Sequence, residues 1–456
     1  MAGLAAAHRL ASANRDVVVF EAGASVGGVV GSVVADGFRF ERSAHTILAG
    51  SATFRHVVDE LGLSPRLERA DPAAKTRWLW HRSSLRALPS KPLELLTTNL
   101  LSWKAKRVLL SEPFRAFVPP RHDAAEPTFG AFLDERIGRE ASRLFAGAFV
   151  RGIHAAELDE LGARSAFPGL WELAVLHKSI LRGVAARSFA RREPLPGPEL
   201  SRNALVSFPN GLQELVDAFT RHLSDRVRTR TSVIGIERFE RRWLVRTSDG
   251  LSTVADDVVV TTPAPIAALL LASALERDQL ATIRSVQHAS VTLVGLGFAP
   301  KTLAALPRGF GYLVPPTEDG RLSPAPRALG TIFVTNLFPH RAPQGASSVA
   351  SFYRGTDVEQ LDDSALARLA EQDLALAIAA PVPRAAVMHV ERWNEVIPRH
   401  SPGSADRVAA IRRTLRESAR GLHVAGAWVD GVSVENVLSS GRSAADRILE
   451  EKGERS

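Results

Sequence analysis

Glycines and an acidic residue near the start of the chain have the types and spacing of a dinucleotide-binding site. Gly3 occupies the last glycine of a G-x-G-x-x-G pattern and opens an alanine-rich helix, and the apolar segment 16–20 leads to Glu21. In such sites an acidic residue about 20 positions after the glycines holds the adenosine ribose hydroxyl. Gly27 and Gly28 follow, and adjacent glycines let backbone approach a ligand where a Cβ would clash. An ordinary helix and strand would explain Gly3 but not this glycine pair.

A second candidate ligand site lies near the end of the chain. The apolar segment 421–426 reads as a buried strand that ends at Gly426, and a helix is predicted to begin near Val434. The free N–H groups and positive dipole end of a helix start suit an anion or an electron-rich ring edge. A plain strand, turn and helix would give the same pattern.

The side chains present no recognisable nucleophilic or metal-dependent machinery. The sequence has no cysteine and no HExxH pattern, and it shows no Ser-His-Asp array. His45 and His177 could act as bases, but lone histidines are more often structural, and we assign a catalytic role to neither. We expect no metal and no catalytic side chain, with the reactivity supplied by a cofactor.

The scaffold that positions these residues is predicted to be globular, with two or three domains. The chain has 456 residues, of which 45% are hydrophobic and 23% charged. We expect neither a membrane-spanning helix nor a signal peptide. The lack of cysteine fits a cytoplasmic protein. The net charge of +8 is scattered without a nucleic-acid-binding module, so no nucleic-acid partner is expected.

Hydrophobic periodicity divides the chain into three kinds of segment. Two strands are predicted at 76–82 and 85–89, and helices are predicted from 92 to about 190. Alternating apolar residues beyond Ser290 indicate an antiparallel sheet. Further strands of an α/β pattern are predicted at 16–20, 233–237, 243–247, 257–263 and 421–426.

Several motifs occur in an order that resembles the oxygen-dependent protoporphyrinogen oxidases of the amine oxidase and phytoene desaturase superfamily. They extend over nearly the whole chain, and their number and order argue against chance similarity. The motifs are Glu21 with Gly27, Gly28 and Ser32, the runs 152–155, 167–170 and 177–180, Phe208 with 211–213, the runs 309–315, 329–330 and 338–343, Arg392 with Trp393, and the run 421–445.

The resemblance implies an α/β and α+β fold. A glutathione-reductase-type, Rossmann-like FAD-binding domain is expected to be discontinuous, and an antiparallel-sheet substrate domain and a helical insertion complete it. The FAD-binding domain would take residues 1–75, 203–265 and 415–456. The substrate domain would take 76–91 and 266–414, and the insertion 92–202.

The resemblance also implies FAD as the cofactor. The glycine pair would lie along the FAD pyrophosphate, a valine backbone would contact the adenine, and the loop after Gly426 would contact the flavin and ribityl chain. The implied FAD contacts are Gly3, Glu21, Gly27, Gly28, Ser32, Val233, Gly426, Val432, Ser433 and Val434.

The implied substrate is a tetrapyrrole. Arg77 would pair with a propionate, a role that the guanidinium fork suits. Phe310 and Leu313 would sandwich a pyrrole ring, and Gly152 would lie near the reacting tetrapyrrole. The implied reaction is oxidation of protoporphyrinogen IX to protoporphyrin IX, with molecular oxygen as the electron acceptor, in haem biosynthesis.

Three alternatives stay open. The substrate could be coproporphyrinogen III, or the protein could be a flavin desaturase or amine oxidase that acts on an isoprenoid or an amine. From another class, it could be a non-catalytic binding protein. Departures from the family put the substrate in doubt more than the cofactor: residues 42–46 replace a Gly-Pro-Asn-type loop common near the flavin, Arg399 and His400 replace Gln-Tyr, and Ala156 replaces a common glycine.

The resemblance leaves open both the membrane association and the oligomeric state of the protein. The helical insertion could rest on the inner face of the cell membrane, because Lys104, Lys106 and Arg107 follow Trp103 beside apolar leucines. An internally packed helix with a charged outer face is an equal alternative. A homodimer is one option for the oligomeric state.

The first residues predict an incomplete nucleotide motif. Family members carry a strand and two glycines before the position of Gly3, so one hypothesis is an upstream start. The chain as written is expected to bind flavin weakly or not at all.

Overall fold

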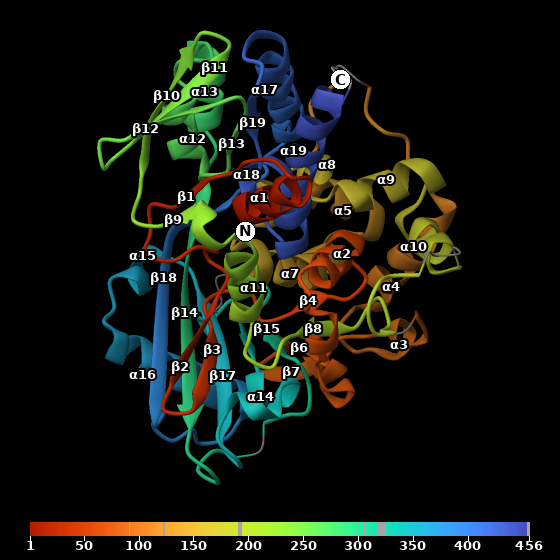
Figure 1. The fold of residues 1–456 in the computed structure, drawn as a ribbon. Helices are drawn as coiled ribbons and strands as arrows, with labels where there is room; N and C mark the ends of the chain where they lie inside the picture. The colour runs from red at the N-terminus through yellow and green to blue at the C-terminus, as the bar shows by residue number, and fades with distance from the viewer. Residues whose placement is uncertain (91, 122–123, 190–193, 305, 317–324, 454–456) are drawn as a thin grey trace.

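A computed structural model describes residues 1–90, 92–121, 124–189, 194–304, 306–316 and 325–453. Three packed parts are visible in Figure 1. Segments from the beginning, middle and end of the chain form an α/β part in the upper half. A large mixed sheet with helix α16 lies below it, and a group of helices lies to one side.

The α/β part is discontinuous in sequence, as predicted. Helix α1 (Ala2–Ser12) packs on α19 (Val434–Gly453) and beside α11 (Gln213–Leu223). The α1–α19 approach is close, because a Cβ on Gly441 would lie 2.1 Å from the Ala2 carbonyl oxygen. Parallel strand pairs complete this part: β1 (Val19–Phe20) with β9 (Val227–Arg228), and β13 (Val258–Val260) with β19 (Leu422–Val424).

A second layer of the α/β part lies over β13 and β19. An antiparallel sheet of β10 (Val233–Phe239), β11 (Arg242–Thr247) and β12 (Ser252–Ala255) packs there with α12 (Ala264–Leu270), α13 (Arg277–Arg284) and α17 (Ser404–Ser418). These three helices bury their apolar faces with Trp243 and Trp428 in one core. Helix α13 lies inside the range 266–414, whereas α12 and α17 extend across its two limits, and all three pack with the α/β part. The domain division itself stays a prediction.

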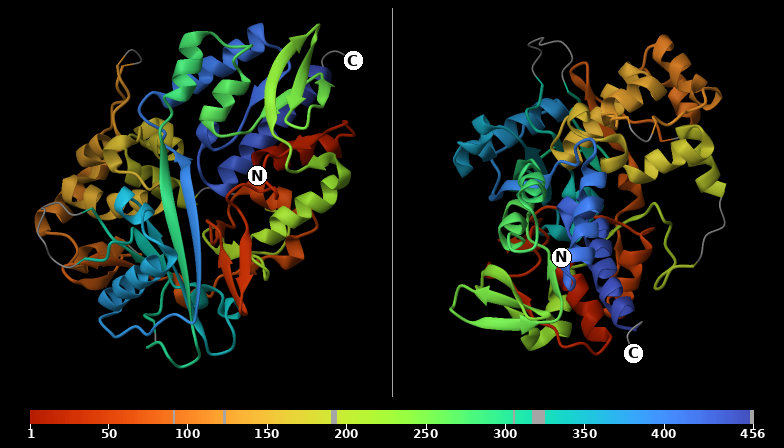
Figure 2. Two further views of the ribbon diagram at one scale, coloured as in Figure 1. Left: turned by 90° about the vertical axis from the view of Figure 1, so that its left-hand side faces the viewer. Right: turned by 90° about the horizontal axis from the view of Figure 1, so that it is seen from above.

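Seven strands form the largest sheet, and its long antiparallel strands confirm the alternation seen beyond Ser290. Its order is β18-β14-β17-β16-β15-β6-β7, with β6 and β15 parallel and the other neighbours antiparallel. Figure 2 shows β14 and β18 as long strands lying side by side. The bounds are β6 (Arg77–His81), β7 (Ser84–Ala87), β14 (His288–Phe298), β15 (Gly311–Leu313), β16 (Gly330–Ile332), β17 (Ser347–Tyr353) and β18 (Val387–Pro398).

One face of this sheet is buried against a helix. Val294, Leu296 and Phe298 alternate along β14 and pack with Tyr312 and the apolar side of α16 (Asp363–Ile378). The Asp362 side chain accepts a hydrogen bond from Ala365 N and so caps the start of α16. The opposite face of the sheet therefore points toward the other two parts.

Small sheets join the parts. The hairpin of β2 (Ser32–Ala35) and β3 (Phe38–Glu41) lies on the second face of the large sheet, where Phe38 and Phe40 cover Gly297 and Gly295. Strands β4 (Ile47–Leu48), β8 (Leu205–Ser207) and β5 (Glu68–Arg69) form another small sheet, and α2 (Ala52–Glu60) follows β4.

The helices predicted between 92 and 190 are present in the described residues. Their centre is the buried Glu112 carboxylate, which accepts from Arg136 and from the first N–H groups of α10. No helix among the described residues has the length and apolar character to cross a bilayer. The bounds are α3 (Pro92–Thr97), α4 (Trp103–Ser111), α5 (Phe129–Ile137), α6 (Arg139–Ala141), α7 (Ala148–His154), α8 (Ala163–Ala166), α9 (Pro168–His177) and α10 (Ile180–Phe189).

Candidate functional site

Two glycines from opposite ends of the chain meet beside the first turn of α1. A Cβ on Gly3 would lie 2.9 Å from Thr261 Oγ1, just beyond β13. A Cβ on Gly426, just beyond β19, would lie 3.6 Å from the Thr261 carbonyl oxygen and 4.0 Å from Ala2 Cβ. The carboxyl ends of strands β13 and β19 therefore both lie beside the start of α1. Ligands in such sheets bind outside the carboxyl ends of the strands.

Glu21 lies at the same edge, directly after β1. Its side chain accepts from Gly23 N at 2.7 Å, and its carbonyl oxygen accepts from Thr231 N at 2.9 Å. Burial lowers the pKa of the Met1 amino group to about 6, and the nearby Glu21 carboxylate opposes that shift. Val233 opens β10 two residues after Thr231. The structure thus brings Glu21, the region of Val233 and the start of α1 together.

The glycine pair has two different surroundings. Gly27 adopts φ +104° and packs on α11, because its Cβ would lie 2.9 Å from Val216 Cγ2. Gly28 adopts φ +64°, is exposed, and would have nothing within 4 Å of its Cβ. Gly28 therefore leaves backbone open to a ligand, whereas Gly27 serves packing.

The Ser32 side chain is hydrogen-bonded within the protein. Its hydroxyl donates to Glu41 Oε2 at 2.6 Å and accepts from Gln213 N at 3.2 Å. Since both directions of hydrogen bonding are used, the Ser32 side chain supports the start of α11 and the β2–β3 hairpin. The contact of Ser32 with FAD is therefore predicted to be made by its backbone atoms.

A hydrogen-bonded network holds the loop that contains Gly426, Val432 and Ser433. Gly426 N donates to Ser440 Oγ at 2.8 Å, and Ser440 in turn donates to Asp430. Ser433 Oγ accepts from the N–H of Asn436 at 3.1 Å, so it caps α19, which begins at Val434 as predicted.

These observations fit a bound dinucleotide. Two helix starts, α1 and α19, present free N–H groups, Gly28 exposes bare backbone, and Glu21 ends a parallel strand. The individual contacts to FAD stay predictions.

The second face of the large sheet carries the predicted substrate residues and is called the site face here. Cross-strand pairing places Arg77 opposite Gly311, and Leu79 opposite Leu313. Leu313 is opposite Gly330, which is opposite Phe352. Directly paired residues share a face, so these side chains point the same way.

Gly152 of α7 faces Leu313. A Cβ at Gly152 would lie 2.6 Å from Leu313 Cδ2, and one at Gly330 would lie 3.0 Å from the same atom. Phe149 and Ile153 lie one helical turn apart on α7, and they are 47% and 46% exposed. Leu313 thus sits between two glycines, beside an exposed apolar stripe of α7.

Arg77 and Phe310 form a second pair. The Arg77 guanidinium lies 5.6 Å from the centre of the Phe310 ring, and within the described ranges no carboxylate forms an ion pair with it. Phe310 packs with Ala74 and Leu337, in a different cluster from Leu313. A sandwich between Phe310 and Leu313 is therefore not favoured, and Phe352 is an aromatic residue that shares the site face with Leu313.

Sequence reasoning missed a buried ion pair. Arg341 Nη1 donates to Glu41 Oε1 at 2.6 Å, and both side chains are almost inaccessible to solvent. Arg341 lies inside the motif 338–343, which explains why that run needs an arginine. The pairing itself has no local signal, because the two residues are 300 positions apart.

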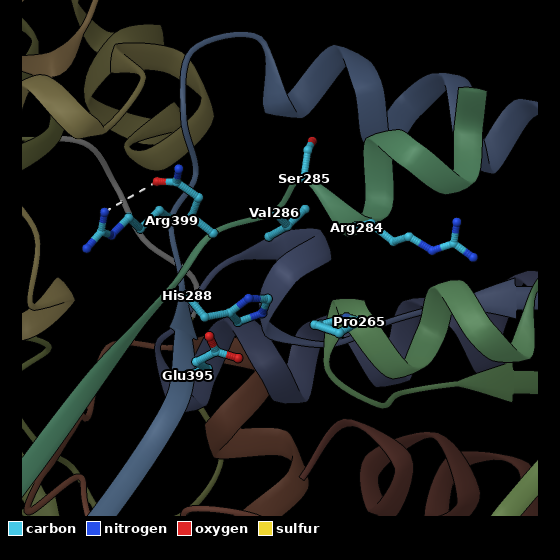
Figure 3. A pocket seen from close by; sticks show the side chains of 8 residues that line it. Pro265, Arg284, Ser285, Val286, His288, Glu395 and Arg399 are labelled. Atoms are coloured by element: carbon cyan, nitrogen blue, oxygen red, sulfur yellow. Dashed lines mark hydrogen bonds between the residues drawn. The ribbon is translucent and has the colours of Figure 1, made fainter. Parts of the chain in front are cut away.

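A cavity of about 430 Å³ lies elsewhere, between the start of β14 and the end of β18. In Figure 3 the side chains of Arg284 and Arg399 point away from each other, and the dashed line marks the hydrogen bond from Arg399 to Gln287. Arg399 Nη1 also donates to Glu160, outside the cavity lining, at 2.9 Å. The two guanidinium groups do not converge on one ligand. None of the predicted site residues lines this cavity, so we assign it no role in the chemistry. Its lining residues are Pro265, Arg284, Ser285, Val286, Gln287, His288, Glu395 and Arg399.

The fold and the nucleotide site define a flavin-dependent oxidoreductase. The chain belongs to the family of flavin-containing amine oxidoreductases, whose model matches residues 1–449. FAD is the cofactor of this class and of this protein.

Curated relatives carry two related names. Protoporphyrinogen oxidase of Homo sapiens is 31% identical over 98% of this chain and 96% of its own length. Protoporphyrinogen oxidase 2 of Arabidopsis thaliana is 25% identical over 98% and 92%. Coproporphyrinogen III oxidase of Bacillus subtilis is 22% identical over 95% and 92%.

Solved structures share the fold. A candidate protoporphyrinogen oxidase from Exiguobacterium gives a TM-score of 0.80 at 21% identity, covering 99% of this chain and 97% of its own. A UDP-galactopyranose mutase gives 0.72 at 17% identity, covering 99% and 94%. The predicted fold class is confirmed.

Proposed function

We propose that the protein oxidises protoporphyrinogen IX to protoporphyrin IX in haem biosynthesis, with molecular oxygen as the final electron acceptor. The observation that carries the proposal is Arg77, a guanidinium without a carboxylate partner in the described chain, at one end of an apolar face. A porphyrinogen matches that pattern, because it combines a broad apolar ring system with propionate groups. The names of the relatives in human and Arabidopsis support the same substrate.

Each residue of the site face has a proposed task. Arg77 holds a propionate through charge-assisted hydrogen bonds. Leu313 and Phe352 contact the macrocycle, and Gly152 leaves room for it beside α7. FAD supplies the redox chemistry, because a bound flavin accepts a hydride from a carbon beside a pyrrole ring.

Coproporphyrinogen III is the second candidate, and the Bacillus subtilis relative favours it. It carries four carboxylates, whereas protoporphyrinogen IX carries two. Arg77 is the one charged side chain among Arg77, Leu79, Leu313, Phe352 and Gly152, which favours the substrate with fewer charges.

The test is an assay of the FAD-loaded protein with both porphyrinogens. We expect porphyrin fluorescence to rise in air, faster with protoporphyrinogen IX. Without oxygen, the added porphyrinogen should bleach the flavin absorbance at about 450 nm. Bleaching by an amine or a polyene, but by neither porphyrinogen, would establish the desaturase or amine oxidase alternative. A protein that stays colourless with excess FAD would support the non-catalytic alternative.

We also propose that the helical part rests on the inner face of the cell membrane, with the enzyme otherwise cytoplasmic. Trp103, Leu110 and Phe114 are 74%, 47% and 83% exposed and recur at helical spacing along α4 and the turn after it. Lys104 and Arg107 beside them are exposed and suit anionic headgroups. Pelleting with anionic but not neutral liposomes at low salt would support this location. Sedimentation of the same sample would test the homodimer.

A further inference from the structure

The segment from Arg42 to Leu48 crosses the site face with both ends held. Arg42 Nε donates to Glu391 of β18 at 2.8 Å, and Trp393 Nε1 donates to the Arg42 carbonyl oxygen at 2.8 Å. At the other end, Leu48 N donates to Glu435 in the first turn of α19 at 3.0 Å. The segment thus bridges the edge of the large sheet and the helix start predicted to contact the flavin.

His45 is the middle of this bridge. Its ring meets Phe352 of the site face edge-on, with centroids 5.8 Å apart, and the residue is 5% exposed. Phe352 shares its face with Leu313 through the paired Gly330. His45 therefore lies between the predicted substrate contacts and the predicted cofactor contacts.

The hydrogen bonding of His45 decides which ring nitrogen is a base. Nδ1 lies 3.0 Å from the Ser43 carbonyl oxygen, and a carbonyl oxygen only accepts, so Nδ1 carries the hydrogen. In the neutral ring Nε2 then keeps its lone pair. Among the described residues Nε2 has no hydrogen-bond partner, and it is not one of the unpaired atoms that are sealed from solvent.

The surroundings keep this ring neutral. Burial lowers the pKa of His45 to about 4, the bond to Ser43 opposes this, and the Arg341 guanidinium adds to it. Phe352 contributes no charge, and the Arg42 guanidinium on the same segment is paired with Glu391. His45 is therefore an unprotonated acceptor at neutral pH.

We propose that His45 Nε2 accepts the proton that a pyrrole N–H of the bound tetrapyrrole loses during oxidation. The proposal rests on the proposed function, since it requires a substrate with N–H groups beside the oxidised carbon. It adds a catalytic residue to a site in which the flavin alone was expected to act.

A porphyrin has six hydrogens fewer than its porphyrinogen, four from the methylene bridges and two from pyrrole nitrogens, so an N–H proton is lost in two of the three two-electron steps. In each of these two steps a C–H bond of a methylene bridge breaks, and bound FAD would take up its hydride. Positive charge develops on that carbon and on the neighbouring pyrrole nitrogen as the hydride leaves. The N–H bond of that pyrrole breaks in the same step, its electron pair stays on the nitrogen as a lone pair, and its proton moves to Nε2. The imidazolium returns the proton to water, and in the remaining two-electron step the proton comes from the fourth methylene bridge instead.

Two substitutions and one control test this role. H45A and H45Q are expected to bind FAD with an unchanged spectrum but to slow anaerobic flavin bleaching by the porphyrinogen by about 100-fold or more, the usual range for a lost general base. Free imidazole should restore part of the rate in H45A. The control is H8Q, which removes a buried histidine that packs against Phe219 and His222 in the α/β part.

The outcomes separate the two proposals. If the wild-type protein oxidises a porphyrinogen and H45A and H45Q do so at similar rates, the role of His45 is overturned while the proposed function stands. Slow variants without imidazole rescue, with a slow H8Q, would mean lost structure and would also overturn it. If the wild-type protein oxidises no porphyrinogen, the proposed function itself fails.

A spectroscopic measurement tests the same role without turnover. In protein with nitrogen-labelled histidine, the signals absent from H45Q belong to His45. We expect them to show the neutral form with hydrogen on Nδ1, and the Nε2 signal to move when protoporphyrin IX is added. An Nε2 signal unmoved by the porphyrin, or hydrogen on Nε2, would contradict the proposal.

Discussion

The guanidinium of Arg341 and the carboxylate of Glu41 face each other in the protein interior, with 2.6 Å between Nη1 and Oε1. Arg341 also donates to the Ser207 hydroxyl and the Phe208 carbonyl oxygen, and Glu41 also accepts from Leu212 N. The pair therefore ties the β2–β3 hairpin, the end of β8 and the start of α11 to the motif 338–343. It fixes the point from which the His45 segment leaves β3.

Removal of one partner should cost far more stability than loss of a surface pair. E41Q leaves the Arg341 charge buried without its counter-ion, so the free energy of unfolding should fall by about 3–5 kcal/mol. E237Q breaks the exposed pair of Glu237 with Arg246 and should cost under about 1 kcal/mol. Urea unfolding of the three proteins measures both changes. Equal losses of unfolding free energy in the two variants would show that the buried pair stabilises the protein no more than the exposed pair.

Two buried histidines should make stability depend on pH. Burial lowers the pKa of His45 and of His154 to about 4, and nearby His400 adds to the shift at His154. Because the folded protein holds these protons less tightly than the unfolded chain, stability is full above about pH 6.5 and falls as the pH drops toward 4. Each group can contribute a loss of up to about 3 kcal/mol.

The variant H154F tests the share of one histidine. The phenylalanine can keep the edge contact that His154 makes with Phe167, whose ring centre is 5.2 Å away. Urea unfolding at several pH values between 7 and 5 should show a shallower decline in H154F than in the wild type. An unchanged slope would mean that His154 does not take up a proton when the protein unfolds.

Arg77 should govern substrate affinity rather than flavin binding. R77M removes a charge-assisted contact worth about 1.5–3 kcal/mol, so KM for protoporphyrinogen IX should rise about 10- to 150-fold. R77K should lose less, because it keeps the charge but not the bidentate fork. R221M, on the exposed side of α11, is the matched control and should leave KM unchanged. An unaltered KM in R77M would remove Arg77 from the substrate site.

Gly28 and Gly62 form a matched pair for the cofactor contact. They have φ of +64° and +68°, and neither would have an atom within 4 Å of an added Cβ. G28A and G62A should therefore carry similar backbone strain. We expect only G28A to weaken FAD binding, by about tenfold or more, because its methyl group would occupy the space of the pyrophosphate. Equal FAD dissociation constants in the two variants would place the cofactor away from Gly28.

The elements could be predicted because their signals are local. The strand at 76–82, the helices from 92 to 190 and the helix start at Val434 follow from periodicity and glycine placement, and the structure confirms them. The approach of Glu21 to the start of α1 was also predictable, since Gly3 and Glu21 lie at the two ends of one helix–strand unit. The limit between the sheet and the α/β part was not readable, because α12 and α13 are amphipathic helices that could have packed on either side.

The amino-acid sequence by itself determined the class of this protein, a cysteine-free flavoprotein with a split nucleotide fold, because glycines and apolar periodicity act over a few residues. Tertiary structure alone decided which side chains share the site face. Strand register places Phe352 on the same face as Leu313, and Phe310 packs in another cluster. The Ser32 hydroxyl donates its hydrogen bond to Glu41. The hydrogen bond of His45 Nδ1 to the Ser43 carbonyl oxygen also leaves Nε2 as the acceptor atom of the ring. Such relationships depend on contacts between residues hundreds of positions apart, and no short stretch of sequence encodes them.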